Sequence, residues 1–441
     1  MKHKFQKIFC ATAALCLFGT ALASVSKVDA YAQETQAYNF EEIMAPVWEG
    51  DISYMETVLP VENPYGGMDP IQLLYPIEEV IEVKNAELNI TYKKGVDYAV
   101  AGGKLLIADD GAIPTLAYSE FHPLTGENGF QDEDGGYICF HEGDYFHKQQ
   151  IVVTYTHTAN YDGYVPEEKG DLLPNVTDKL QKGTGLDLLV LGDSISVGAN
   201  SSGFIGAAPH MPTYPELFAA QLENTYGGKI NLINPSVGGM GIDWGLNKID
   251  EILSEQTNLD LAVIAFGMND GSMAPAVFAQ KTLAAAEKVK EKFPNAEVML
   301  VATMLPNPKA KFFNLNQSKF YDAMVEMCQQ DGIAVVNVSG VHQSLLKRKS
   351  YSDMTGNNVN HPNDYLARVY AQTLFATLQV KQVEVEVPTI GAESDSQQDS
   401  QAQNATIVGL LSGCTSTASI ALCGAMALGA ATIALKKKKD D

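Results

Sequence analysis

The chain has 441 residues, which is enough for two or three domains with a sizeable core. Its 53 acidic residues outnumber its 30 basic residues, and its formal net charge is −23. Because nucleic-acid binding needs a basic surface, this balance argues against DNA or RNA as a partner.

The first thirty residues are typical of a signal peptide. Lys2, Lys4 and Lys7 precede an apolar stretch over 8–22, and small residues follow it at Ala21-Leu-Ala23 and again at Val28-Asp-Ala30. A basic start, an apolar centre and a small-residue cleavage site are the three parts of an export signal. We therefore expect residues 1–30 to direct export and to be removed.

Residues 36–165 predict a β-domain. Short β-rich runs are separated by Gly, Asp and Pro, and they lie at 88–92, 98–100, 104–107, 137–140 and 150–155. This spacing favours a β-sandwich, followed by a linker over 161–175. The aromatic residues of this region could form a sugar-stacking face or fill the core. They include Trp48, Tyr54, Tyr65, Tyr118, Phe121 and Tyr145.

Residues 185–380 alternate between strand and helix patterns. The predicted strands are 187–191, 230–234, 260–266, 297–302 and 333–338. The predicted helices lie near 213–226, 242–256, 274–292, 315–330 and 362–379. Regular alternation of this kind indicates an α/β domain, in which a parallel sheet is covered by helices on both faces.

The first strand of this region delivers a serine to a turn. The apolar run 187–191 ends in Gly192-Asp-Ser194, and ligands of open α/β sheets bind beyond the carboxyl ends of such strands. Ser194 therefore lies where a nucleophile would be useful. The same three residues also make an ordinary turn and helix cap.

Three further blocks place polar groups at comparable points. A glycine-rich turn with Gly239 follows the second strand, and Asn269 follows the third strand within Gly-Met-Asn-Asp. His361, followed by Pro362, stands at the start of the last helix. Taken singly, these blocks could be a flexible loop, a turn residue and a surface or capping histidine.

Together the four blocks resemble those of the SGNH hydrolases, also called GDSL esterases. The resemblance covers about residues 185–380 and implies a flavodoxin-like three-layer α/β fold. It implies that Ser194 attacks an ester carbonyl and that His361 is the general base. It also implies an oxyanion hole made by the backbone N–H groups of Ser194 and Gly239 and the side chain of Asn269. Such donors are each worth about 10²- to 10³-fold in rate.

One position departs from this family pattern. The family usually carries an aspartate three residues before its histidine, and this chain has Asn358 there. The nearest upstream acid is Asp353, and Asp364 lies just downstream. We expect either a Ser-His dyad assisted by a neutral oxygen, such as that of Asn358, or a triad completed by Asp353.

The C-terminal region predicts a membrane anchor. Residues 387–405 have the composition of a disordered tether. Residues 407–435 carry no charge and are long enough to cross a bilayer, and four lysines follow at 436–439. We therefore expect an exported enzyme anchored by a transmembrane helix in the plasma membrane of a Gram-positive bacterium.

The remaining motifs are few. Of the six cysteines, only Cys139 and Cys328 lie between the signal peptide and the predicted span. They fall in different predicted domains, so a disulfide between them is not expected. The sequence has no phosphate-loop lysine motif and no His and Cys residues at metal spacing, so we expect neither a metal nor a cofactor.

A β-domain in front of an SGNH domain resembles certain bacterial two-domain carbohydrate esterases. We therefore expect a surface-anchored serine esterase that removes O-acetyl groups from carbohydrates. Two alternatives remain, namely a lipase or thioesterase acting on lipid acyl chains and a catalytically silent glycan-binding protein. Fold analogy alone does not choose among the three.

Overall fold

The computed structural model describes residues 38–379, which belong to one compact unit. The predicted signal peptide (1–30), tether (387–405) and transmembrane helix (407–435) lie outside these residues. Within residues 38–379, no helix is both long and apolar enough to cross a membrane. Cys139 and Cys328 are both buried and free.

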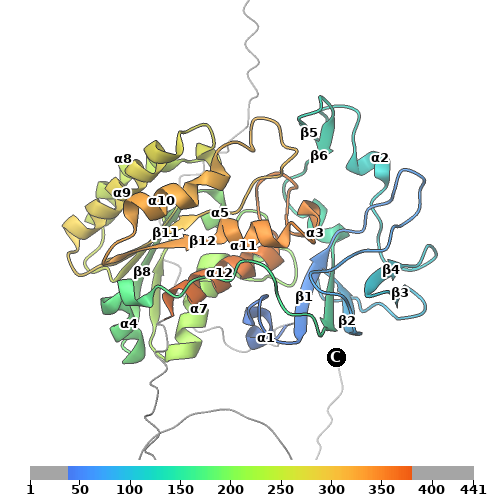
Figure 1. Cartoon of the computed structure of the whole chain (residues 1–441), viewed down its shortest axis with the longest axis horizontal. Helices are drawn as coiled ribbons and strands as arrows, with labels where there is room; N and C mark the ends of the chain where they lie inside the picture. The colour runs from blue at the N-terminus through green and yellow to red at the C-terminus, as the bar shows by residue number, and fades with distance from the viewer. Residues whose placement is uncertain (1–37, 380–441) are drawn as a thin grey trace, which may run out of the picture. The chain divides into compact units, whose positions relative to one another are not determined.

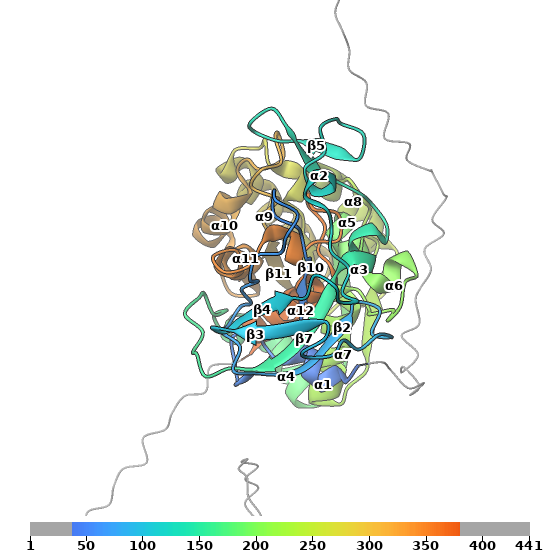
Figure 2. The ribbon, with the colours of Figure 1, turned by 90° about the vertical axis from the view of Figure 1, so that its right-hand side faces the viewer.

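The N-terminal segment, residues 38–157, is built from short antiparallel strands. Its elements are α1 (Phe40–Met44), β1 (Ile52–Val58), β2 (Glu79–Asn85), β3 (Tyr98–Ala101), β4 (Lys104–Ile107), α2 (Tyr118–Phe121), β5 (Gly129–Gln131), β6 (Tyr137–Cys139), α3 (Tyr145–Gln149) and β7 (Ile151–Thr156). Strands β1, β7 and β2 form one sheet, and β3–β4 and β5–β6 form two hairpins. Figure 2 shows the β3–β4 hairpin beside β7 and β2. The β-rich content is confirmed, whereas a β-sandwich is not.

One predicted strand of this segment is wrong. Residues 88–92 contain a turn, because the side-chain oxygen of Asn85 accepts hydrogen bonds from the backbone N–H groups of Asn89 and Ile90. Leu88 also has a φ of 61°, in the left-handed region that strands do not use. These two features turn the chain back after β2.

The predicted parallel sheet is confirmed. Its strands are β8 (Leu186–Gly192), β9 (Ile230–Ile233), β10 (Leu261–Ala265), β11 (Glu297–Ala302) and β12 (Ile333–Asn337). Their order across the sheet is β12-β11-β10-β8-β9, and every neighbouring pair is parallel. This is the flavodoxin-like strand order, in which the chain switches direction across the sheet beside its first strand. That switch point lies between β8 and β10, where Ser194 emerges.

Helices cover both faces of the sheet (Figure 1). They are η1 (Gly170–Leu172), α4 (Pro174–Gln181), α5 (Ser194–Val197), α6 (Ser202–Ile205), α7 (Tyr214–Tyr226), α8 (Ile242–Ser254), η2 (Met268–Asp270), α9 (Pro275–Lys292), η3 (Gln317–Lys319), α10 (Phe320–Cys328), α11 (Val338–Leu345), η4 (Tyr351–Asp353) and α12 (Asp364–Leu378). Helices α8, α9 and α10 pack on one face with Leu189 and Leu191. Helices α4, α7, α11 and α12 pack on the other face with Leu188 and Val190. This alternation along β8 explains why the strand is apolar throughout.

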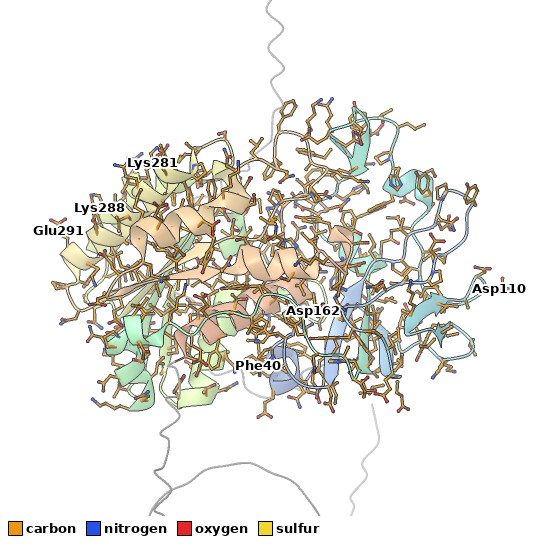
Figure 3. The ribbon with its side chains drawn as sticks, viewed as in Figure 1. Phe40, Asp110, Asp162, Lys281, Lys288 and Glu291 are labelled. Carbon is orange, nitrogen blue, oxygen red and sulfur yellow. The ribbon has the colours of Figure 1, made fainter. Side chains whose placement is uncertain are left out.

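Surface ion pairs tie neighbouring helices together. Lys281 and Lys288, labelled on α9 in Figure 3, contact Asp243 and Asp250 of α8. These pairs are at least partly exposed, so each adds little to stability.

The N-terminal segment packs directly against the α/β domain through α12. Arg368 donates to the backbone oxygen of Met55 (2.8 Å), and Gln372 donates to that of Ala45 (2.9 Å). A fully buried ion pair joins Lys349 to Glu56 of β1 at 2.6 Å. As a result α12, which follows the predicted histidine, is buried on nearly all sides.

The aromatic residues of the N-terminal segment do not share one environment. Trp48 is 7% exposed and belongs to the core, whereas Tyr65 is 96% exposed and Tyr118 is 38% exposed. Trp48 therefore fills the core, as one of the two interpretations expects, whereas exposed residues such as Tyr65 and Tyr118 could contact a ligand.

Candidate active site

Ser194 lies at the carboxyl end of β8, at the switch point of the sheet. The Asp193 side chain caps the following turn of helix by accepting a hydrogen bond from the Ile195 N–H at 3.0 Å. Gly192 has no room for a side chain, since a Cβ would lie 2.2 Å from the Ser196 hydroxyl and 2.5 Å from the Ala265 backbone oxygen. Close packing thus requires glycine at position 192, and Asp193 fixes the turn that presents Ser194.

The structure brings Ser194 and His361 together. The distance from Ser194 Oγ to His361 Nε2 is 2.9 Å, and each residue is 8% exposed. His361 lies in the loop before α12, whose first turn is capped by the Asn363 side chain. A serine hydroxyl becomes a useful nucleophile when a base accepts its proton, and this contact supplies that base.

The other ring nitrogen of His361 is held by a neutral oxygen. Asn200 Oδ1 lies 2.6 Å from His361 Nδ1. The Asn200 amide nitrogen donates to the backbone oxygens of Gly143 (3.1 Å) and Gly356 (3.4 Å), which leaves its oxygen facing the ring. Nδ1 therefore carries the proton, and the lone pair of Nε2 points at Ser194.

The glycine turn and the asparagine block meet beside Ser194. A Cβ on Gly238 would lie 3.7 Å from the Ser194 Cβ, and Gly239 has a φ of 76° that favours glycine. Asn269 Nδ2 donates to the Met240 backbone oxygen at 2.9 Å, which fixes the two blocks together. Among residues 38–379, no group accepts a hydrogen bond from the backbone N–H of Ser194 or Gly239. These donors can therefore serve an oxyanion.

Neither of the two expected partners of His361 lies at the ring. Asp353 accepts hydrogen bonds from the backbone N–H groups of Leu59 and Ser350, so it ties its own loop to the end of β1. Asn358 has a φ of 65°, and its amide donates to the Cys139 backbone oxygen. The left-handed backbone turns the Asn358 side chain toward β6. The prediction that Asn358 or Asp353 assists His361 is therefore wrong, because the contacts of both side chains hold them away from the ring.

Sequence reasoning missed the groups that do surround the ring. Asn200, Asn357 and Glu142 all approach Nδ1, and Glu142 Oε2 lies 3.4 Å from it. Asn200 stands shortly after Ser194 and Asn357 stands beside the expected position 358, so both are near the motif blocks. Glu142 belongs to the N-terminal segment, and no spacing in the sequence points to it.

The carboxyl groups of the site have displaced pKa values. Burial raises the pKa of Asp193 to about 7, and burial raises the pKa of Asp270 to about 6. Burial alone would raise the pKa of Glu142, but its contacts with His361, Asn357 and Asn200 outweigh that effect and lower it. In the part of the chain that the structure describes, no three His, Cys, Asp or Glu side chains are grouped to hold a metal ion.

Residues 190–369 match the GDSL-like lipase/acylhydrolase family. No curated protein sequence matches the chain. A solved two-domain esterase (CEX) active on acetylated mannans is 21% identical, with a TM-score of 0.37, over 49% of this chain and 55% of that chain. The chain thus covers about half the length of that esterase.

A second solved structure is a catalytic mutant of Axe2, an acetylxylan esterase from Geobacillus stearothermophilus. It is 14% identical, with a TM-score of 0.38, over 46% of this chain and 97% of that chain. The family match begins within β8 and includes Ser194, the glycine turn, the asparagine block and His361. The α/β domain of this chain therefore belongs to the GDSL-like lipase/acylhydrolase family.

Proposed function

We propose that this protein is a carboxylic ester hydrolase with Ser194 as its nucleophile. The observation that carries the proposal is the chain of contacts from Ser194 Oγ to His361 Nε2 (2.9 Å) and from His361 Nδ1 to Asn200 Oδ1 (2.6 Å). This arrangement holds the one tautomer of histidine that can accept the serine proton.

The reaction follows from these positions. His361 accepts the proton as Ser194 Oγ bonds to the acyl carbon, and the carbonyl oxygen becomes an oxyanion. The N–H groups of Ser194 and Gly239 and the amide of Asn269 stabilise that oxyanion. His361 then protonates the leaving alcohol, and the acyl group stays on Ser194. Water next attacks the acyl carbon while His361 accepts a proton from it, and His361 returns that proton to Ser194 Oγ as the acid is released.

We propose acetylated carbohydrates as the substrate class. The leaving alcohol departs on the side of His361, because His361 protonates it. That side is bordered by two polar side chains that reach solvent, the half-exposed Glu142 and the partly exposed Asn360. The hydroxyl groups of a sugar can hydrogen-bond to these two side chains, whereas the alkyl chain of a lipid alcohol offers them no hydrogen bond.

A substrate screen tests both statements. Purified protein and Ser194→Ala are assayed on acetyl and long-chain acyl esters and on acetylated glycans. We expect wild type to release acetate from glycans and Ser194→Ala to be inactive with an unchanged fold. Preference for long acyl chains would support a lipase or thioesterase instead. Glycan binding without hydrolysis of any ester would overturn the enzymatic proposal.

We also propose that the protein is exported and anchored at the cell surface. The support is the sequence of residues 1–30 and 407–435 alone. Deleting residues 406–441 should release active protein into the medium. If the truncated protein still fractionates with membranes, another element anchors it.

A further inference from the structure

We propose that Glu142 of the N-terminal segment is the charged partner of His361 and completes the catalytic site as a positioning residue. The inference rests on the proposed esterase function and adds a residue from outside the family-matched region. It makes the N-terminal segment part of the catalytic machinery, in addition to any glycan contact it makes.

The Glu142 side chain is held beside the ring by a defined set of contacts. Its Oε2 lies 3.4 Å from His361 Nδ1, and its Oε1 accepts a hydrogen bond from Asn357 Nδ2 at 3.1 Å. The second proton of that amide goes to Asn360 Oδ1 at 2.9 Å. Although Asn357 Nδ2 also lies 3.0 Å from Nδ1, both of its protons have oxygen acceptors. Asn357 therefore fixes the carboxylate and has no proton left to donate to His361 Nδ1.

The backbone around Glu142 is fixed to the same loop. Gly143, the next residue, accepts from Asn200, which also holds the imidazole. Gly356 makes this approach possible, since a Cβ there would lie 2.4 Å from the Asn200 Cβ. Asn200 thus links the residue after Glu142, the loop of His361 and the ring itself.

Further contacts seat the histidine loop on the N-terminal segment. Gln150 donates to the backbone oxygens of Ser352 (3.0 Å) and Thr355 (2.9 Å). Gln150 in turn accepts from Asn363, the residue that caps α12. Because these contacts are buried, the segment cannot shift without moving the loop that carries His361.

The chemistry of the reaction gives the carboxylate a role. His361 becomes an imidazolium in the transition state, and an anion close to Nδ1 stabilises that charge. The other ionisable groups near this region are Asp193, beside the nucleophile, and Asp364, whose carboxylate accepts from the Ser202 N–H at 2.7 Å. Asp270 interacts electrostatically with Asp193. Glu142 is the carboxylate that lies directly against Nδ1.

Solvent limits the size of the effect. The Glu142 side chain is 53% exposed, so water screens its charge. An opposite charge at this distance favours the protonated form of a histidine by about 10- to 10³-fold. Because water screens Glu142, we expect its effect to lie at the lower end of that range. The same interaction acts on Glu142, because its contacts with His361 lower the pKa of the carboxyl.

Kinetics against pH test the proposal on the full protein. Glu142→Gln keeps the acceptor for Asn357 and removes the charge. We expect kcat to fall about 10- to 100-fold with little change in KM, and the acidic limb of the kcat/KM profile to move to lower pH. The acidic limb moves to lower pH because Glu142→Gln removes the negative charge that stabilises the imidazolium. Glu142→Asp should restore most of both properties.

A matched control separates charge from packing. Glu120 lies in the same segment and accepts from the Tyr145 hydroxyl at 2.6 Å, so Glu120→Gln removes a nearby carboxylate from outside the contacts of His361. We expect its pH profile to match wild type. A wild-type rate and pH profile in Glu142→Gln, or equal losses in both variants, would overturn the proposal.

A second measurement separates this inference from the proposed function. Nuclear magnetic resonance of the His361 ring follows its titration without any substrate. If wild type hydrolyses no ester, the esterase function fails, and the ring titration of wild type against Glu142→Gln still decides whether Glu142 stabilises the imidazolium. If wild type is active and the ring titrates alike in both proteins, only the role of Glu142 fails.

Discussion

Asp193, the residue before the nucleophile, should make stability fall as the pH rises. Its carboxyl is fully buried, one oxygen accepts from the Ile195 N–H, and the other has no partner among residues 38–379. Burial raises its pKa from 3.8 to about 7. The folded protein therefore binds this proton more tightly than the unfolded chain does. The stabilisation is complete below about pH 4 and is lost as the pH rises to about 7.

The size of this effect follows from the two pKa values. A difference between 3.8 and about 7 corresponds to a free energy on the order of 4 kcal/mol. Asp193→Asn keeps an oxygen for the Ile195 N–H and does not titrate. Relative to wild type, the free energy of unfolding of this variant should therefore increase by on the order of 4 kcal/mol between pH 4 and pH 8.

Urea unfolding at a series of pH values measures this difference. Taking variant minus wild type cancels the other titrating groups. One such group is His342, whose pKa burial lowers to about 3 and whose contribution to stability has the opposite slope. A difference that stays constant with pH, or that decreases as the pH rises, would refute the assignment of a raised pKa to Asp193.

Three further predictions concern the site and the buried ion pair that supports it. Asn269→Ala should lower kcat by about 10²- to 10³-fold in steady-state assays, as loss of one oxyanion donor does, and unchanged turnover would remove Asn269 from the site. Asn200→Ala should lower kcat by at least about 10-fold, because Nδ1 loses its nearest acceptor, and Asn200→Asp should lose less; equal losses would contradict that role. Lys349→Met should destabilise the protein by about 3–5 kcal/mol in urea unfolding, because it leaves the buried Glu56 carboxylate without its counter-charge. Adding Glu56→Gln should recover part of that loss, and no recovery would show that the charge is not the cause.

The α/β domain was predictable because its signals are local. The apolar run of β8 faces helices on both sides, and each of the other strands of the sheet was also found within one residue of its observed ends. Ser194, Gly239 and Asn269 follow strands β8, β9 and β10, and His361 precedes α12. Since carboxyl ends of parallel strands share one edge, position in the sequence was enough to bring these blocks together.

The N-terminal segment was harder because its signals depend on distant partners. Strand β1 contains Glu56, whose buried carboxylate has its counter-charge in Lys349 of the distant α/β domain. Strand β2 carries charged residues at Glu79, Glu82 and Lys84 without a regular alternation, so its pattern does not stand out from a loop. Partners of this kind cannot be read from spacing along the chain.

The same limit explains the error at the histidine. The expected position, Asn358, adopts a left-handed backbone and faces β6, while Asn200 and Glu142 reach the ring from other parts of the chain. The expectation of a neutral oxygen beside His361 holds, but Asn200 supplies it. The contact of Glu142 with the ring depends on how the two parts of the chain pack.

Labelling of the purified protein with a fluorophosphonate tests the central claim most directly, because this probe reacts only with an activated serine. The contacts among Ser194, His361 and Asn200 predict one phosphonyl group per chain, located on Ser194 by mass spectrometry, together with loss of ester turnover. They also predict that His361→Ala is scarcely labelled. A labelled site other than Ser194, or full ester turnover by Ser194→Ala, would contradict the account.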